Sequence, residues 1–188
     1  MRICVYCSSS DAVDSVYVEA AHALGHEIAT RGHELVYGGA SVGLMGDVAR
    51  AATAAGGRVL GIIPQRFVQR NLAYQDANDM IITETMAQRK AQMIELAEAF
   101  VALPGGFGTL EVVSEVLTLM QLGDLNRALV LMNTAGFYED LLALFERFFA
   151  GSFARREYRR LYHVASDACD ALDHIEHYQP FKVPDKWF

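Results

Sequence analysis

The residues best suited to hold an anionic ligand lie at positions 103–111, in the sequence LPGGFGTLE. An apolar run precedes them and a helical pattern follows, which indicates that a strand turns into a helix at the glycines. Because glycine allows close backbone approach and a helix start offers unpaired N–H donors, this turn favours a phosphate, although a plain tight turn is the alternative. The substrate-binding candidates in this segment are Gly105, Gly106, Phe107, Gly108 and Thr109.

A second glycine-rich turn, residues 38–46, also follows an apolar run and precedes an alanine-rich helical pattern. The alternative to ligand binding here is close helix packing, which Gly46 alone would permit. Ser9 lies in the polar turn after the first apolar run, where ligands of open α/β sheets bind, but serines there can equally cap a helix. The candidates from these two turns are Ser9, Gly38, Gly39, Gly43 and Met45.

Two cations and two carboxylates complete the set of residues with chemistry to offer. Arg89 and Lys90 are adjacent in a helical pattern, about 100° apart, so they cannot both face the core. A solvated face is the usual explanation, and the alternative is that Arg89 binds a phosphate or carboxylate in a forked geometry. Glu111 and Glu115 lie on one helix face, where a carboxylate beside a bound ribose would stabilise an oxocarbenium-like transition state or activate water. An ordinary surface position is the alternative for Glu115.

These candidates must be positioned by elements that alternate regularly along the chain. Predicted strands cover residues 2–7, 34–37, 58–63, 80–83, 99–103, 128–132 and 161–165. Predicted helices cover 17–30, 47–55, 85–97, 110–122, 137–149 and 167–177, and residues 65–79 are expected to form a polar loop. Alternating strands and helices predict an α/β fold, a Rossmann-like doubly wound parallel sheet with helices on both faces.

Composition and charge limit the class of protein. The 188 residues, 52% hydrophobic and 21% charged, predict a single globular domain over 1–180 with a short tail at 181–188. A net charge of −7 argues against a nucleic-acid partner, which needs a basic face. The chain shows no leader and no apolar span of membrane length, so we expect a cytoplasmic protein without a membrane partner.

The cysteines and histidines do not form a metal-binding motif. Cys4 and Cys7 have CxxC spacing, but Cys4 falls inside a strand-like run and no second pair accompanies them. Thiols of the core or of a strand end are therefore the favoured interpretation, and no metal site is predicted.

Four segments together resemble the Lonely Guy (LOG) family of cytokinin-activating enzymes. They are residues 4–10 (CVYCSSS), 37–46 (YGGASVGLMG), 86–90 (MAQRK) and 104–109 (PGGFGT). The resemblance, which extends from residue 2 to about residue 180, implies a Rossmann-like homodimer that needs no cofactor. It also implies hydrolysis of the N-glycosidic bond of a purine ribotide, which releases the base and ribose 5-phosphate.

The resemblance also assigns roles to single residues. The turn 105–109 matches the phosphate cradle, and Arg89 and Lys90 match an Arg-Lys pair whose arginine is implicated in catalysis. Thr118 matches a further substrate contact, and Asn71 stands where the family usually has a substrate-contacting glutamate. The last glutamate of the family motif PGGxGTxxE, thought to be catalytic, falls at Val112.

The prediction is therefore a phosphoribohydrolase acting on a purine nucleoside 5′-monophosphate, of the cytokinin or adenosine type. Its predicted catalytic residues are Arg89, Glu111 and Glu115, and Lys90, Asn71 and Thr118 join the predicted substrate contacts. The alternative is a nucleotide-binding protein with weak or no hydrolase activity, because Val112 cannot replace a carboxylate. The apolar helical patterns at 112–122 and 137–149 independently favour a homodimer.

Overall fold

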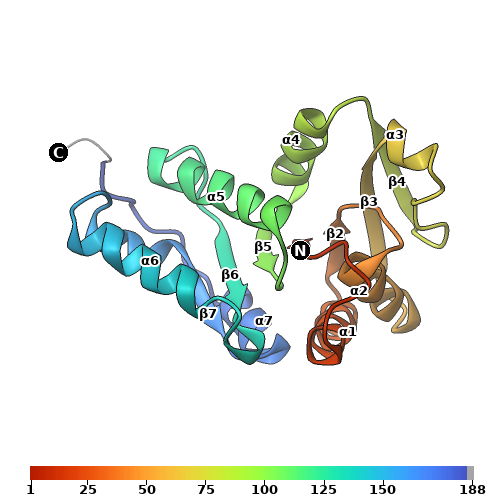
Figure 1. Ribbon diagram of the computed structural model, residues 1–188, viewed down its shortest axis with the longest axis horizontal. Helices are drawn as coiled ribbons and strands as arrows, with labels where there is room; N and C mark the ends of the chain where they lie inside the picture. The colour runs from red at the N-terminus through yellow and green to blue at the C-terminus, as the bar shows by residue number, and fades with distance from the viewer. Residues whose placement is uncertain (186–188) are drawn as a thin grey trace.

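Seven parallel strands form one sheet in the computed structural model, which describes residues 1–185 (Figure 1). The strands are β1 Arg2–Tyr6, β2 Glu34–Tyr37, β3 Arg58–Pro64, β4 Asp79–Thr83, β5 Ala99–Ala102, β6 Ala128–Met132 and β7 His163–Ala165. Their order across the sheet is β4-β3-β2-β1-β5-β6-β7. The chain builds outward from β1 to β4 and then returns to the other side of β1, which places a topological switch point between β1 and β5.

Helices cover both faces of this sheet. They are α1 Ser15–Thr30, α2 Gly43–Ala54, α3 Gln65–Val68, α4 Met86–Leu96, α5 Phe107–Leu122, α6 Glu139–Ala150 and α7 Ala168–Glu176, with 3-10 turns η1 Thr134–Gly136 and η2 Arg156–Leu161. Helices α1, α2 and α7 pack on one face, and α4, α5 and α6 pack on the other (Figure 1). The predicted doubly wound parallel sheet is confirmed.

The central strands are mainly apolar because both of their faces are buried. Along β1, Ile3 and Val5 pack against the α1–α2–α7 side, whereas Cys4 and Tyr6 pack against the α4–α5 side. A strand of a one-sided sheet would show alternating polar residues instead. The two apolar layers fix β1 in the centre, directly beneath the switch point.

Several element boundaries differ from the prediction. Helix α2 begins at Gly43 and α5 at Phe107, so glycines assigned to turns belong to first helical turns, where their entropic cost matters least. The expected loop 65–79 contains α3, and η2 takes up the beginning of the strand predicted at 161–165.

The described part of the C-terminal tail packs on the domain. The Asn126 side-chain amide donates a hydrogen bond to the Phe181 carbonyl (2.7 Å), and the Tyr158 hydroxyl donates one to the Pro184 carbonyl (3.2 Å). Residues 186–188 of the predicted tail lie outside the described residues. Within residues 1–185 no helix has the length and hydropathy needed to span a bilayer.

Candidate functional site

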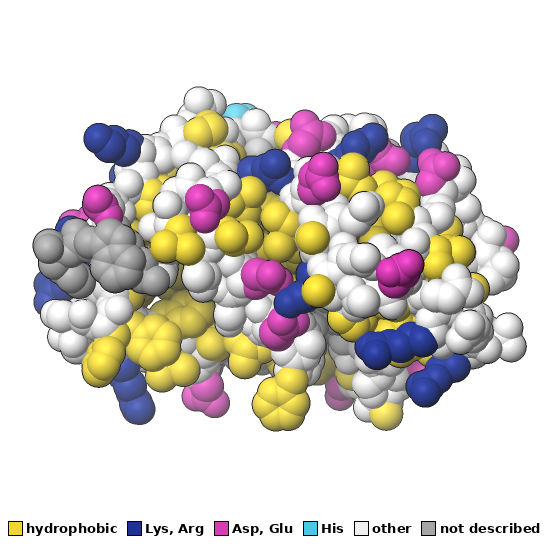
Figure 2. Space-filling model, turned by 90° about the horizontal axis from the view of Figure 1, so that it is seen from above, with side chains coloured by type: hydrophobic (Ala, Val, Ile, Leu, Met, Phe, Trp, Pro, Cys, Tyr) yellow, Lys and Arg dark blue, Asp and Glu magenta, His cyan; other side chains and the backbone are white. Residues whose placement is uncertain are grey.

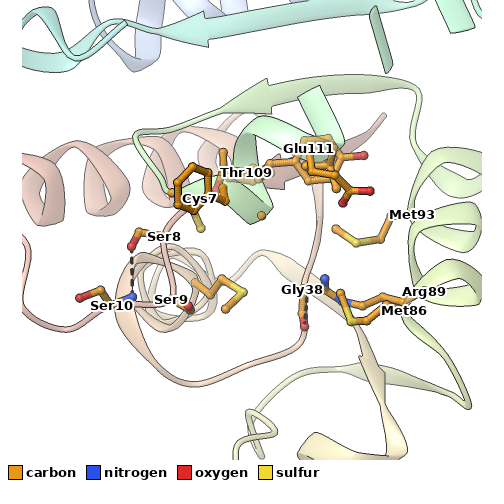
Figure 3. A pocket seen from close by; sticks show the side chains of 17 residues that line it. Cys7, Ser8, Ser9, Ser10, Gly38, Met86, Arg89, Met93, Thr109 and Glu111 are labelled. Carbon is orange, nitrogen blue, oxygen red and sulfur yellow. Dashed lines mark hydrogen bonds between the residues drawn. The ribbon is translucent and has the colours of Figure 1, made fainter. Parts of the chain in front are cut away.

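A pocket of about 400 Å³ opens at the carboxyl ends of β1, β2 and β5, on the side covered by α4 and α5 (Figure 3). It therefore occupies the switch point, where open α/β sheets bind ligands. Its lining residues are Val5, Tyr6, Cys7, Ser8, Ser9, Ser10, Gly38, Met45, Met86, Arg89, Met93, Gly106, Phe107, Gly108, Thr109, Glu111 and Val112.

The start of α5 supplies hydrogen-bond donors to this pocket. The Gly106 carbonyl accepts bonds from the N–H groups of Thr109 and Leu110, both at 3.0 Å. Within residues 1–185, the N–H groups of Phe107 and Gly108 have no acceptor and no side chain caps this helix end. A Cβ added to Gly106 would meet no atom within 4 Å, so the space in front of these donors is open. An anion is favoured here.

The start of α2, in the second glycine turn, is not open in this way. The Gly43 N–H donates to the Asp11 carboxylate at 2.7 Å, so this helix end already has an anionic partner. Gly43 (φ +55°) and Gly39 (φ +75°) are positions that favour glycine, and a Cβ would meet the Ser9 backbone at 2.5 Å or Ile63 at 2.8 Å. These two glycines serve backbone packing, whereas Gly38 from the same turn lines the pocket.

Arg89 reaches the pocket from α4 and is held by backbone carbonyls. Its Nε donates to the Ile62 carbonyl (2.9 Å) and its Nη2 to the Gly38 carbonyl (3.0 Å). A Cβ at position 38 would lie 1.9 Å from the guanidinium, so any other residue there would displace Arg89 from this position. Burial lowers the pKa of Arg89, but an arginine stays charged at neutral pH. No carboxylate in the described chain forms an ion pair with it, so its charge is available to a ligand.

Lys90 is not among the residues that line the pocket, and it pairs with both carboxylates of α5. Its Nζ contacts the Glu111 carboxylate directly and lies 3.1 Å from Oε2 of Glu115. The hydrogen bond to Glu111, followed by that to Glu115, raises the pKa of Lys90, so the ammonium stays charged. Glu111 lines the pocket, whereas Glu115 lies one helical turn farther on and does not.

The remaining wall of the pocket is apolar or neutral. Val112 is buried and packs in the same core cluster as Tyr6 and Met93. Burial raises the pKa of the Cys4 thiol to about 12 and that of Cys7 well above its ordinary value. Both thiols are therefore protonated at neutral pH, and Cys7 contributes to the wall without the reactivity of a thiolate.

The pocket brings together part of the predicted site. Of the predicted residues it is lined by Ser9, Gly38, Met45, Arg89, Gly106, Phe107, Gly108, Thr109 and Glu111. Lys90 and Glu115 adjoin it through the ion pairs with α4 and α5. Gly105 lies beneath the turn, where a Cβ would meet the Thr109 hydroxyl at 2.1 Å.

Two predicted substrate contacts lie elsewhere in this chain. Asn71 is exposed in the turn after α3, with φ +57°, and is not among the pocket residues. The Thr118 hydroxyl donates to the Ser114 carbonyl (2.8 Å), and the residue lines a separate groove between α5 and α6.

Several lining residues were not among those predicted from the sequence, notably Tyr6, Met86 and Met93. Met86, Arg89 and Met93 are spaced by three and four residues, which is the signal of a single helix face. This spacing could have identified the pocket side of α4.

Comparison with known proteins identifies the family. The family model described as possible lysine decarboxylase matches residues 45–175. An Arabidopsis thaliana protein named cytokinin riboside 5′-monophosphate phosphoribohydrolase LOG2 is 41% identical over 179 residues, which cover 95% of this chain and 84% of that protein. The chain belongs to the LOG family. A rice relative (Oryza sativa subsp. japonica), named probable cytokinin riboside 5′-monophosphate phosphoribohydrolase LOGL5, is also 41% identical, over 95% of this chain and 73% of its own length.

LOG family membership confirms the resemblance inferred from the four sequence segments. Among solved structures, the molybdenum cofactor carrier protein from Chlamydomonas reinhardtii has a TM-score of 0.72 and 24% identity, covering 93% of this chain and 95% of that chain. At this level of identity the similarity supports the fold alone.

Proposed function

We propose that the protein hydrolyses the N-glycosidic bond of a purine nucleoside 5′-monophosphate, releasing the free base and ribose 5-phosphate. One observation carries this proposal: the start of α5 and the guanidinium of Arg89 face the same pocket. Among the described residues, no side chain caps this helix start and no carboxylate pairs with Arg89. Together they offer directed N–H donors and a fixed positive charge, which suit a phosphorylated ligand. The activity named for the relatives supports the same class of substrate.

The pocket has room for a nucleotide and offers a suitable group for each part of it. A volume of about 400 Å³ falls in the range typical of small-molecule sites. We assign the 5′-phosphate to the N–H groups of Phe107 and Gly108, in the same pocket wall as Thr109. The purine then lies along the apolar wall that includes Met86 and Met93.

The reaction requires only water as its second reactant. The bond between C1′ of the ribose and the purine nitrogen breaks, and its electron pair leaves with the base. Positive charge develops at C1′, so a carboxylate nearby stabilises the transition state. Water then adds to C1′ to complete ribose 5-phosphate, and its proton balances the charge on the departing base.

A second candidate function is nucleotide binding with little or no turnover. Val112 favours it, because this buried apolar side chain occupies the motif position at which the family has a glutamate. Lysine decarboxylation is disfavoured, since Lys90 at the edge of the site is paired with two carboxylates and lacks a recognisable pyridoxal-phosphate context.

A base-release assay over a panel of nucleoside monophosphates, run beside calorimetry, tests the proposal. We expect free base from AMP or its N6-substituted analogues, with the pyrimidine monophosphate CMP as a poor substrate. Tight AMP binding without base release would favour the second candidate instead. The absence of both AMP binding and base release would show that the pocket serves another ligand.

A further inference from the structure

Because Val112 stands at the position of the motif glutamate, another residue must supply a carboxylate to this site. The side chain at position 112 is apolar and buried against Tyr6 and Met93, so it offers no charge to C1′ of a bound ribotide. Among the pocket-lining residues of the described chain, Glu111 alone carries a carboxylate. Figure 3 shows Glu111 on α5 and Arg89 on α4 reaching the same cavity from different elements.

We infer that Glu111 supplies the catalytic carboxylate and that Lys90 and Glu115 are positioning residues that hold it at the edge of the pocket. This inference rests on the proposed function and assigns the residues that carry it out. The side chain of Glu111 is 57% exposed, so water and substrate have access to it. The Glu115 carboxylate pairs with the same Lys90 ammonium but lies one turn farther from the cavity.

Lys90 is well placed to fix the orientation of Glu111. Its own side chain is only 17% exposed, which leaves it few alternative positions. Helix α4 is anchored in turn by a capping box, in which Thr85 accepts a hydrogen bond from the Gln88 N–H and the Gln88 side chain bonds back to the Thr85 N–H. The carbonyl bonds of Arg89 tie the same turn of α4 to the sheet. A rigid support of this kind is what a catalytic carboxylate needs.

The charges around Glu111 come from three elements. From α4, Lys90 contacts the carboxylate and Arg89 is a second cation at the pocket. From α5, Glu115 is an anion that shares the Lys90 ammonium, and from β1 the neutral Tyr6 hydroxyl faces the same cluster. Removing Lys90 therefore leaves both carboxylates of α5 without this partner, whereas removing the charge of Glu115 leaves the pair of Lys90 with Glu111 in place.

The proposed step balances as follows. As the bond between C1′ and the base nitrogen breaks, the electron pair leaves with the base and Glu111 accepts a proton from the attacking water. The water oxygen bonds to C1′, and the proton passes from Glu111 to the base nitrogen or to solvent. Glu111 is thereby returned to its ionised state, and no other reactant is consumed.

The experiment measures base release from AMP and AMP affinity for four variants. We expect Glu111→Gln to lower kcat about 10²–10⁴-fold with AMP affinity close to wild type. Lys90→Met should lower kcat up to about 100-fold, also with AMP affinity close to wild type, and Lys90→Arg should restore part of the rate. Glu115→Gln should cause a smaller loss of kcat.

A matched control variant, together with a thermal melting curve of each variant, separates these effects from simple loss of an ion pair. Glu146→Gln on α6 breaks the remote pair with Arg159 of η2 and should leave kcat unchanged. An active wild type with an equally active, folded Glu111→Gln variant would overturn the inference alone. A large gain in kcat on Val112→Glu would overturn it too, because position 111 would then lack the role. A wild type that binds AMP but releases no base would contradict both this inference and the proposed function.

Discussion

At the scale of single residues, the adjacent cations Arg89 and Lys90 contact different groups. Among the described residues, Arg89 bonds only to main-chain carbonyls and keeps its charge available at the pocket, whereas the Lys90 ammonium is paired with Glu111 and Glu115. The helix separates them by about 100°, so one side chain reaches the sheet and the other reaches α5. Arginine suits the first position because its planar fork serves two carbonyls and still presents a face to a ligand.

Arg89→Lys tests this difference while keeping the positive charge. A lysine ammonium cannot reproduce the forked contacts with Ile62 and Gly38, and each charge-assisted bond contributes about 1.5–3 kcal/mol. We expect AMP affinity, measured by calorimetry, to fall about 10–100-fold in a folded protein. Arg66→Lys, on a short helix away from the pocket, is the control and should bind normally. Unchanged affinity in Arg89→Lys would exclude Arg89 from ligand binding.

At the scale of elements, two similar glycine turns have different partners. In the turn before α5 the N–H groups of Phe107 and Gly108 have no acceptor among the described residues, while in the turn before α2 the Gly43 N–H is bonded to Asp11. Both turns begin a helix at the carboxyl edge of the sheet, and the sequence alone did not distinguish them. The anion site is therefore assigned to the α5 turn.

Gly106→Val tests the assignment of the phosphate to that turn. No atom lies within 4 Å of a Cβ at this position, so the variant should fold, but its side chain would fill the space in front of the N–H donors. We expect AMP affinity to fall at least about tenfold by calorimetry, since several N–H contacts would be lost. Gly123→Ala, at the other end of α5, is not a suitable control because Gly123 has φ +81°. Leu122→Ala on the exposed end of the helix serves instead and should bind normally. Normal binding by Gly106→Val would place the phosphate elsewhere.

Helix α7 shows how charge anchors an element far from the pocket. Its last residue, Glu176, accepts hydrogen bonds from His33 (2.8 Å) and Arg31 (3.0 Å). The bond from His33, followed by that from Arg31, lowers the pKa of Glu176. Because the folded-state pKa is below the unfolded value, the stabilisation is present above the usual titration range of glutamate and is lost as pH falls through the folded-state pKa.

Glu176→Gln should therefore destabilise the protein at neutral pH and not in acid. Because the side chain is partly exposed, we expect a loss of about 0.5–1 kcal/mol in the free energy of unfolding at pH 7. The difference from wild type should disappear once the pH is below the folded-state pKa of Glu176, where the carboxylate is protonated in both states. Urea unfolding at the two pH values measures both quantities. An equal loss at both would mean that packing, not charge, accounts for the effect.

The elements could be predicted from the sequence far better than the contacts of the site. Apolar runs such as 99–103 and helical spacing such as 17–30 are local signals. The boundaries of most strands lie within about two residues of their predicted positions. Helix starts at Gly43 and Phe107 were missed because glycine signals a turn equally well. The pairing of Lys90 with Glu111 could not be foreseen, since it joins α4 to α5 across the β1–β5 switch point.

At the scale of the whole molecule, an apolar groove marks a surface outside the pocket. Figure 2 views the α4–α5 side and shows hydrophobic side chains on both halves of this face, including the half where α5 and α6 lie. A groove of about 330 Å³ between these helices is lined largely by aromatic residues, with Phe153 86% exposed at its edge. We propose that a second copy of the chain covers part of this surface, in line with the homodimer predicted from the sequence.

Light scattering coupled to size exclusion tests the dimer. We expect a mass of twice 20.8 kDa at micromolar concentration. The double change Phe148→Glu and Phe153→Glu should give a monomer, because charges would be buried without partners in the interface. Ile82→Glu, at an exposed position on the edge strand β4, is the control and should remain dimeric. A wild-type monomer at this concentration would refute the proposed assembly.

The central claim is that this pocket cleaves nucleoside 5′-monophosphates, and the most direct measurement is the yield of both products from AMP. Free adenine and ribose 5-phosphate are quantified in the same reaction, with adenosine as a parallel substrate that lacks the phosphate. We expect equal amounts of the two products from AMP and far less adenine from adenosine, because the α5 start and Arg89 bind the phosphate. Equal turnover of adenosine, or binding of AMP with no product from any purine monophosphate, would contradict the claim.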